Sequence, residues 1–254
     1  MSTSDYPADS WARTIADLPL NPGPLQNFTL DRPDPAGSNT LALEQDKFKI
    51  RLANSEGRRE SADLLIKKMY SWRGYDTASA LNDEPNRITL MADLKGRIIG
   101  TLTIGLDSSA GLLVDQLYQD EIDRLRQESR MVCEFTKLAV DQDSHSKRVL
   151  AALFHLAFIY AHRIHGATDL VIEINPRHAV FYRRMLGFTQ LGEERMCPRV
   201  NAPALLLRLT CEYVAEKTKQ YGGAMRDLPN VRSLYPYAFS ATDEAGITQR
   251  LLRA

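Results

Sequence analysis

The chain is poor in cysteine and has no surplus of charge of either sign. Cys133, Cys197 and Cys211 are its three cysteines among 254 residues, with no CxxC pair and no cysteine–histidine cluster at zinc spacing. This argues against a disulfide framework and a metal site, and favours a reducing compartment. Lysine plus arginine and aspartate plus glutamate both number 32. A nucleic-acid binder usually has a basic surplus, so we expect no nucleic-acid partner.

Long hydrophobic runs are also lacking. The longest nearly apolar stretch, Val149–Ala161, is interrupted by His155, and a membrane-spanning helix needs about 20 apolar residues. The first 20 residues contain no basic start followed by an apolar run, which is the pattern of a signal peptide. We therefore expect no transmembrane segment and a cytoplasmic location.

What is present is typical of a globular protein, with 44% hydrophobic and 25% charged residues. Six of the 12 prolines lie within residues 1–43, which predicts a flexible arm without a packed element. We expect one domain over residues 44–215 and a C-terminal extension over 216–254.

Within that domain the hydrophobic pattern alternates between strand and helix periods. The sequence predicts helices over Glu60–Trp72, Val114–Arg126, Ser146–His165 and His178–Leu186. It predicts strands over Lys47–Leu52, Arg87–Asp93, Arg97–Leu106, Met131–Val140, Asp169–Ile174, Phe188–Leu191 and Ala204–Leu209. This order favours an α/β fold with a mixed central sheet flanked by helices.

The segment from Asn175 to Phe188 carries the most specific pattern. Asn175 follows a predicted strand, Ala179, Tyr182 and Leu186 share a helical face, and Gly187-Phe188 ends the helix. This pattern resembles the GNAT acyltransferase superfamily. The resemblance implies that this helix holds the pantetheine arm of a thioester, with Asn175 beside it, and that Tyr182 protonates the leaving thiolate. The alternative is that Tyr182 is a core tyrosine.

One GNAT feature is absent. Enzymes of this superfamily that use coenzyme A carry a glycine-rich loop that binds pyrophosphate through backbone N–H groups. The corresponding stretch, Asp141–Arg148, has no glycine, and Asp141 and Asp143 would repel a pyrophosphate. The departure favours acyl-phosphopantetheine on acyl carrier protein as the donor, with acyl-CoA as the other possibility.

Two further segments narrow the resemblance. Glu134–Asp141 looks like a strand of the acyl-homoserine-lactone synthases, with Thr136 in place of Ser and Lys137 in place of Arg. Together with Asn175–Phe188, the run Cys197–Ala204 is similar to the N-acyl amino acid synthases. This resemblance, over about residues 45–210, implies transfer of a long-chain fatty acyl group from acyl carrier protein to the α-amine of an amino acid.

The attack of an amine on a thioester needs a general base and hydrogen-bond donors for the carbonyl oxygen, and the predicted strand 131–140 offers candidates for both. Burial raises the pKa of a carboxyl group, which suits Glu134 to be the general base for the attacking amine. Lys137, the second catalytic candidate, points to the opposite face of a regular strand, so a bulge is needed if both act at one site. Glu134 could instead form a buried ion pair, for example with Arg130 or Lys137. The main-chain N–H groups of Leu138, Ala139 and Val140 are candidates to hold the thioester oxygen.

A fatty acyl chain also needs an apolar tunnel. Phe154 and Phe158, with Ile159, Leu102 and Ile104, are candidates for its lining, although each could simply be core. Acyl carrier proteins are acidic, so a basic patch would steer their docking. The candidates for that patch are Lys147, Arg148, Arg177, Arg183 and Arg184, which could instead be a solvated helix face. For the acceptor carboxylate, the candidates are Arg51, Arg73 and Arg199.

Three other functions compete with an acyl-carrier-protein-dependent N-acyltransferase. An acyl-homoserine-lactone synthase would consume S-adenosylmethionine, and the residues at 136 and 137 count against it. A coenzyme A-dependent N-acetyltransferase is disfavoured by the missing glycine loop. A non-catalytic module that binds acyl carrier protein or lipid would keep the tunnel but would need no base.

Overall fold

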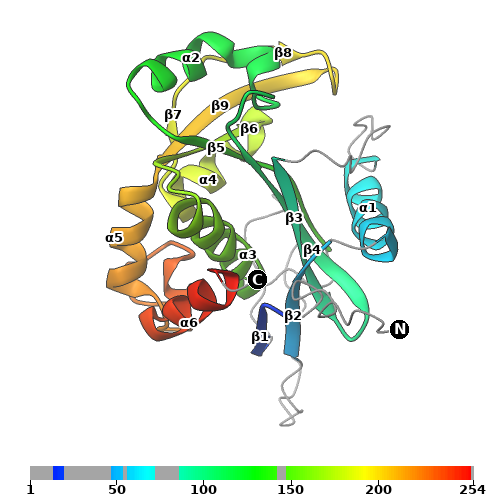
Figure 1. The fold of residues 1–254 in the computed structure, drawn as a ribbon, viewed down its shortest axis with the longest axis vertical. Helices are drawn as coiled ribbons and strands as arrows, with labels where there is room; N and C mark the ends of the chain where they lie inside the picture. Colours follow the sequence, from blue (N-terminus) through cyan, green and yellow to red (C-terminus); the bar gives the residue numbers. More distant parts are fainter. Residues whose placement is uncertain (1–13, 20–46, 54–55, 72–85, 142–146, 253–254) are drawn as a thin grey trace, which may run out of the picture.

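The computed structural model describes residues 14–19, 47–53, 56–71, 86–141 and 147–252. Over this part of the chain one twisted sheet of nine strands runs through the molecule (Figure 1). Its neighbouring strands are antiparallel except β5 and β6, which are parallel, so the sheet is mixed as expected. The spatial order is β1-β2-β3-β4-β5-β6-β9-β7, with β8 also paired to β9. The strands are β1 (Ala16–Pro19), β2 (Lys47–Leu52), β3 (Arg87–Leu94), β4 (Arg97–Leu106), β5 (Val132–Val140), β6 (Asp169–Ile174), β7 (Thr189–Gln190), β8 (Arg195–Cys197) and β9 (Ala202–Thr210).

Helices cover both faces of the sheet. Helix α3 (Lys147–Phe158) is buried on every side, because its apolar residues pack against β3 and β4 on one side and against C-terminal elements on the other. Helix α1 (Glu56–Ser71) covers the opposite face and packs Leu65, Ile66 and Met69 against Ala139. The remaining helical elements are α2 (Asp115–Gln127), η3 (Ile159–Ile164), η4 (Pro176–His178), α4 (Ala179–Leu186), α5 (Cys211–Tyr221), η5 (Tyr235–Tyr237) and α6 (Ala241–Leu252).

Most predicted elements are confirmed, with differences at their ends. The hairpin of β3 and β4 turns at Gly96, which has a φ of +85° as its turn requires. The predicted helix over Ser146–His165 is only partly correct, since α3 gives way to the π-helical turn η3 at Ile159. The expectation of an unpacked N-terminal arm is wrong at β1, where Ile15 and Ala16 are buried and the strand pairs with β2. The rest of residues 1–43 lies outside the described residues.

The C-terminal extension packs onto the main core. Helix α5 crosses the boundary expected at residue 215, and later residues join the same hydrophobic cluster as α3. These residues are Leu234, Tyr235, Phe239, Ile247 and Leu251. The placement of α5 and α6 beside α3 is visible in Figure 1.

A histidine on α3 fastens this extension. The backbone N–H of Phe239 donates to Nδ1 of His155 at 2.9 Å. Because Nδ1 accepts, a neutral ring carries its proton on Nε2, which lies 3.2 Å from Glu244 of α6. Arg163 of η3 donates from Nε to the other oxygen of Glu244 at 2.8 Å. Although burial alone would raise it, the pKa of Glu244 is lowered to about 2 by these two donors.

We expect the Glu244→Gln variant to lose stability at neutral pH and to unfold with a weaker acid dependence. A pKa lowered from 4.5 to about 2 stabilises the fold above pH 4.5, and this contribution disappears as the pH falls towards 2. The expected loss at neutral pH is roughly 3 kcal/mol. Urea unfolding across this pH range measures it, with exposed Glu216→Gln as control. Parallel pH curves for wild type and Glu244→Gln would contradict the prediction.

Candidate functional site

The site lies where two parallel strands separate. The β5–β6 ladder covers only three pairs, from Val132–Asp169 to Glu134–Val171. Beyond them β5 stays with β4, whereas β6 continues along β9 to Ile174. The two strands therefore open a gap in the middle of the sheet.

A β-bulge marks the same place on β5. Thr101 of β4 is opposite Ala139, but Thr103 is opposite Thr136, so one residue of β4 faces two of β5. Lys137 takes up the extra residue with a φ of +52°, a left-handed conformation that is uncommon outside glycine. The buried hydroxyl of Thr101 donates to the Lys137 carbonyl at 3.0 Å, which holds the bulge. The bulge needed to re-aim a side chain of this strand is thus present.

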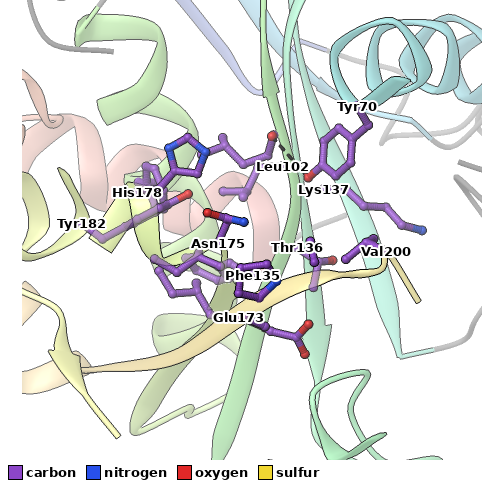
Figure 2. A pocket seen from close by; sticks show the side chains of 17 residues that line it. Tyr70, Leu102, Phe135, Thr136, Lys137, Glu173, Asn175, His178, Tyr182 and Val200 are labelled. Atoms are coloured by element: carbon purple, nitrogen blue, oxygen red, sulfur yellow. Dashed lines mark hydrogen bonds between the residues drawn. The ribbon is translucent and has the colours of Figure 1, made fainter. Parts of the chain in front are cut away.

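A cavity of about 170 Å³ occupies the gap (Figure 2). Its walls come from both separated strands, from α1, α3, η4 and α4, and from the segment that enters β9. The polar and aromatic side chains of its lining are Tyr70, Phe135, Thr136, Lys137, Phe154, Glu173, Asn175, His178 and Tyr182. Its aliphatic lining consists of Leu102, Leu138, Ile172, Ile174, Val200, Ala202, Pro203 and Ala204.

The structure brings Asn175 and Tyr182 together at this cavity. Asn175 caps η4, because its Oδ1 accepts from the N–H of Arg177 at 3.2 Å. Tyr182 is buried on α4, with its ring edge-on to Phe154 and Phe188 at centroid distances of 6.3 and 5.8 Å. The helix ends at Gly187 with a φ of +86°, where a Cβ would clash with the ring of Tyr213. The Asn175–Phe188 pattern therefore builds one wall of the cavity.

Of the three candidate backbone donors on β5, only one lines the cavity. Leu138 lines the cavity, and its carbonyl accepts from the Tyr70 hydroxyl at 3.5 Å. Ala139 packs against α1 and Val140 lies in the main core, and neither lines the cavity. Lys137 lines it as well.

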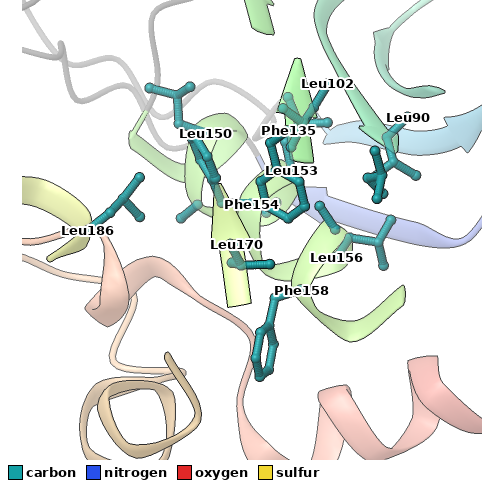
Figure 3. Close-up of a cluster of buried hydrophobic side chains, with 14 of the residues drawn as sticks. Leu90, Leu102, Phe135, Leu150, Leu153, Phe154, Leu156, Phe158, Leu170 and Leu186 are labelled. Atoms are coloured by element: carbon teal, nitrogen blue, oxygen red, sulfur yellow. The ribbon is translucent and has the colours of Figure 1, made fainter. Parts of the chain in front are cut away.

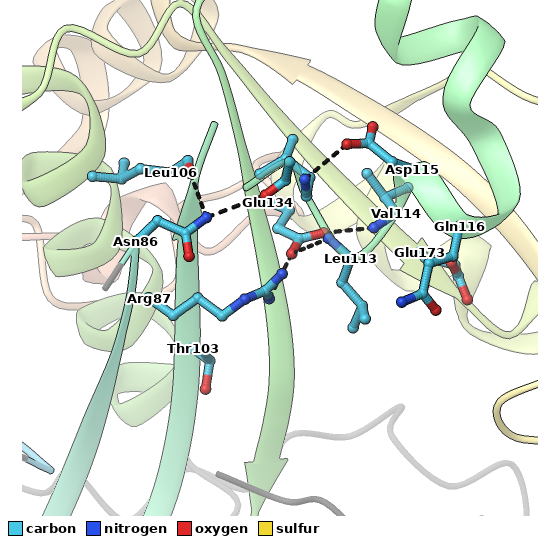
Figure 4. A network of polar contacts seen from close by, with 12 residues as sticks. Asn86, Arg87, Thr103, Leu106, Leu113, Val114, Asp115, Gln116, Glu134 and Glu173 are labelled. Atoms are coloured by element: carbon cyan, nitrogen blue, oxygen red, sulfur yellow. Dashed lines mark hydrogen bonds and ion pairs between the residues drawn. The ribbon is translucent and has the colours of Figure 1, made fainter. Parts of the chain in front are cut away.

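Glu134 lies outside the cavity, within a buried polar network (Figure 4). Its carboxylate pairs with Arg87 at 2.6 Å and accepts from the N–H groups of Leu113 and Val114 at 2.8 and 2.9 Å. Burial raises the pKa of Glu134, and the charge of Arg87 opposes this shift. Gly105 leaves room for the carboxylate, since a Cβ there would lie 2.9 Å from Glu134. The geometry gives Glu134 the task of fixing the loop that leads into α2.

The carboxylate that does line the cavity is Glu173, which sequence analysis missed. Glu173 is on β6, and Nη2 of Arg199 lies 2.6 Å from both of its oxygens. The sequence did contain an indication of Glu173, since it is a single carboxylate between the apolar residues Ile172 and Ile174. The same kind of pattern made Glu134 a candidate. Tyr70 and His178 were missed too, because α1 and η4 reach the cavity only through the tertiary fold.

The arginines proposed for the acceptor carboxylate lie in different places. Arg199 is beside the cavity, but its guanidinium is engaged by Glu173 and also donates to Gln116 at 3.0 Å. Arg51 is on β2 and does not line the cavity. Arg73 lies outside the described residues.

The proposed docking residues divide in a similar way. Arg177, Arg183 and Arg184 are exposed on η4 and α4, next to the wall that carries Tyr182. Lys147 pairs with Asp227 at 2.6 Å. Arg148 is buried, and burial lowers the pKa of its guanidinium, so its expected place on a docking surface is wrong.

The predicted tunnel residues also differ in position. Phe154 and Leu102 line the cavity, whereas Phe158 is buried farther along α3 (Figure 3). Ile104 and Ile159 are core residues. Within the described ranges no group of three or more side chains is arranged to hold a metal ion, and no helix is long and apolar enough to cross a membrane.

The separated strands, the bulge and the helix after β6 define a GNAT-like acyltransferase fold. The sequence profile of the N-acyl amino acid synthase FeeM matches residues 61–210. The chain therefore belongs to the N-acyl amino acid synthase family and is an N-acyltransferase.

Several solved structures are similar to the chain, and one of them is a member of this family. FeeM, an N-acyl amino acid synthase from uncultured soil microbes, is 28% identical, with a TM-score of 0.61 over 66% of this chain and 94% of FeeM. An acyl-CoA N-acyltransferase from Pseudomonas aeruginosa is 14% identical, with a TM-score of 0.46 over 63% of this chain and 97% of its own. The acyl-homoserine-lactone synthase LasI is 12% identical, with a TM-score of 0.43 over 65% and 91% of the two chains. No curated protein sequence matches the chain.

We expect Glu134→Gln to destabilise the fold by about 3 kcal/mol, since removing one partner of a buried ion pair leaves the other charge uncompensated. In addition, the two oxygens of Glu134 accept from the N–H groups of Leu113 and Val114, whereas a glutamine side chain has only one oxygen and would leave one of these donors without its acceptor. Urea unfolding at neutral pH measures the change. The exposed Glu60→Gln variant is the control, expected within about 0.5 kcal/mol of wild type. Equal stability of the two variants would show that the network contributes little.

Proposed function

We propose that this enzyme transfers a long-chain fatty acyl group from acyl carrier protein to the α-amine of an amino acid in the cytoplasm. The observation that supports this most is the cavity between the separated strands, which gathers Asn175, Tyr182 and the Lys137 bulge in a member of the N-acyl amino acid synthase family. The thioester carbonyl would lie in the gap, beside the backbone of Leu138.

The reaction is an aminolysis. The neutral amine attacks the thioester carbonyl, the C–N bond forms, and the C–S bond breaks to release the thiol of phosphopantetheine. One proton must leave the amine and one must reach the thiolate. Tyr182 lines the cavity and can supply the second proton.

We assign the role of general base, which removes the proton of the amine, to Glu173 in place of Glu134. A general base must come within hydrogen-bonding reach of the proton, directly or through one water. Glu173 lines the cavity, whereas Glu134 does not. Arg199 holds the Glu173 carboxylate in place through contacts of 2.6 Å to both oxygens, and a carboxylate at this position can accept the proton of the amine or bind the ammonium of the incoming amino acid.

Charge near the cavity supports acyl carrier protein as the donor. Arg177, Arg183 and Arg184 form an exposed basic group on the two elements that also carry His178 and Tyr182. An acidic carrier protein docked there would present its pantetheine arm to the cavity. The absence of glycine from Asp141–Arg148 removes the usual pyrophosphate site of coenzyme A.

Product analysis tests the proposal. The purified protein is incubated with hexadecanoyl acyl carrier protein, hexadecanoyl-CoA and acetyl-CoA in turn, with all common amino acids and S-adenosylmethionine present, and products are identified by mass spectrometry. We expect hexadecanoyl amino acids, made fastest from the carrier-protein donor. Acetylated products alone, or a lactone, would contradict the proposal. Binding of the carrier protein without any product would favour a non-catalytic module.

Isosteric variants of Tyr182, Glu173 and Glu134 distinguish the roles of these three side chains. We expect Tyr182→Phe and Glu173→Gln each to lower kcat by about 10²-fold or more, because a group that transfers a proton is lost. Glu134→Gln should retain most of its kcat at a temperature where it remains folded. Steady-state kinetics, with the folded fraction checked by circular dichroism, distinguish these cases. A large kcat loss in folded Glu134→Gln with an active Glu173→Gln would return the base to Glu134.

A further inference from the structure

The cavity of the site ends against two aromatic rings. Phe135 of β5 and Phe154 of α3 line it, and their ring centroids are 6.2 Å apart. At about 170 Å³ this cavity is smaller than the about 300–1,000 Å³ of typical ligand pockets. It has room for the reacting end of an acyl donor, but a long chain must extend beyond it.

A second, smaller cavity of about 30 Å³ lies behind the same two rings. Phe135 and Phe154 line both cavities, and Ala151, Phe158 and Leu186 are among the apolar residues of the second. Figure 3 shows Phe135, Phe154, Phe158 and Leu186 in this region of the core. A turn of the two rings would therefore join the two spaces into one apolar channel.

The far wall of the second cavity comes from the C-terminal extension. Leu234, Tyr235 and Ala238 line it, together with Val214 and Thr218 of α5. The family match ends at residue 210, so this wall lies outside the matched residues.

Hydrogen bonds from Leu234, Tyr235 and Phe239 hold that wall in place. The N–H of Leu234 donates to the Met185 carbonyl at 2.9 Å, and the Tyr235 hydroxyl donates to the Leu186 carbonyl at 2.7 Å. The N–H of Phe239 donates to Nδ1 of His155, whose ring also lines the cavity. The wall is thus tied to α3 and α4, the helices that carry Phe154 and Tyr182.

We infer that the segment Leu234–Phe239 closes an acyl channel that runs from the reaction cavity past Phe135 and Phe154, and that it limits the length of the acyl chain. This inference rests on the proposed function for the identity of the ligand. A chain that reaches the wall would bury its terminal methylenes there, each adding about fourfold to affinity.

Fatty-acid binding tests the channel without requiring catalysis. Octanoate, dodecanoate and hexadecanoate compete with an apolar fluorescent probe on wild type, Ala238→Phe and Leu234→Ala. Ala238→Phe fills the second cavity, so we expect at least a tenfold loss of hexadecanoate affinity and less than a twofold change for octanoate. Leu234→Ala enlarges it and should favour the longest chain; it also tests the channel if Ala238→Phe does not fold. The control is Ala245→Phe, the same substitution at an exposed position of α6.

Equal chain-length profiles in wild type and both cavity variants would overturn the inference, as would the same loss in Ala245→Phe. Failure of the proposed function is a separate result. If no N-acyl amino acid forms but the binding profiles shift as expected, the channel stands and the reaction does not. If products form with an unchanged distribution of chain lengths in both cavity variants, the reaction stands and the channel is wrong.

Discussion

The parting of β5 from β6 is the constraint on which the rest of the site depends. Parallel strands normally continue their ladder, but here it stops after Glu134 and Val171. The bulge at Lys137 keeps β5 paired with β4 while β6 follows β9. A gap in the middle of a sheet would expose backbone polar groups to an apolar core, which is costly unless a ligand or side chains satisfy them. A thioester carbonyl is a suitable partner for such groups.

The surrounding structure supports this gap from two directions. On one side Glu134 and Arg87 tie β5 and β3 to the loop before α2, away from the cavity. On the other side the C-terminal extension packs against α3 and α4 through Leu234, Tyr235 and His155. The separated strands are therefore held between a buried ionic network and a hydrophobic core.

The sequence predicted the order of strands and helices well, because such patterns are local: Lys47–Leu52 alternates between exposed and buried residues, and Arg97–Leu106 is an almost continuous buried run. It also placed Asn175 and Tyr182 at one site, through the resemblance of the Asn175–Phe188 segment to the GNAT superfamily. It could not choose between Glu134 and Glu173, since both are single carboxylates in apolar strands and only the tertiary fold decides which one faces the gap. Likewise, nothing local predicts that Leu234–Phe239 packs beside α3, which depends on contacts between residues about 80 apart in sequence.

Hydrogen–deuterium exchange in the presence of a hexadecanoyl-pantetheine amide, a donor analogue that cannot react, tests the central claim most directly. If the gap between β5 and β6 holds the acyl thioester, the analogue should slow exchange in peptides that contain Phe135–Leu138 and Ile172–Asn175. The loop at Leu113 and Val114, on the far side of Glu134, should exchange as in the free protein. Slowed exchange at that loop or elsewhere, with both strands unchanged, would contradict the account.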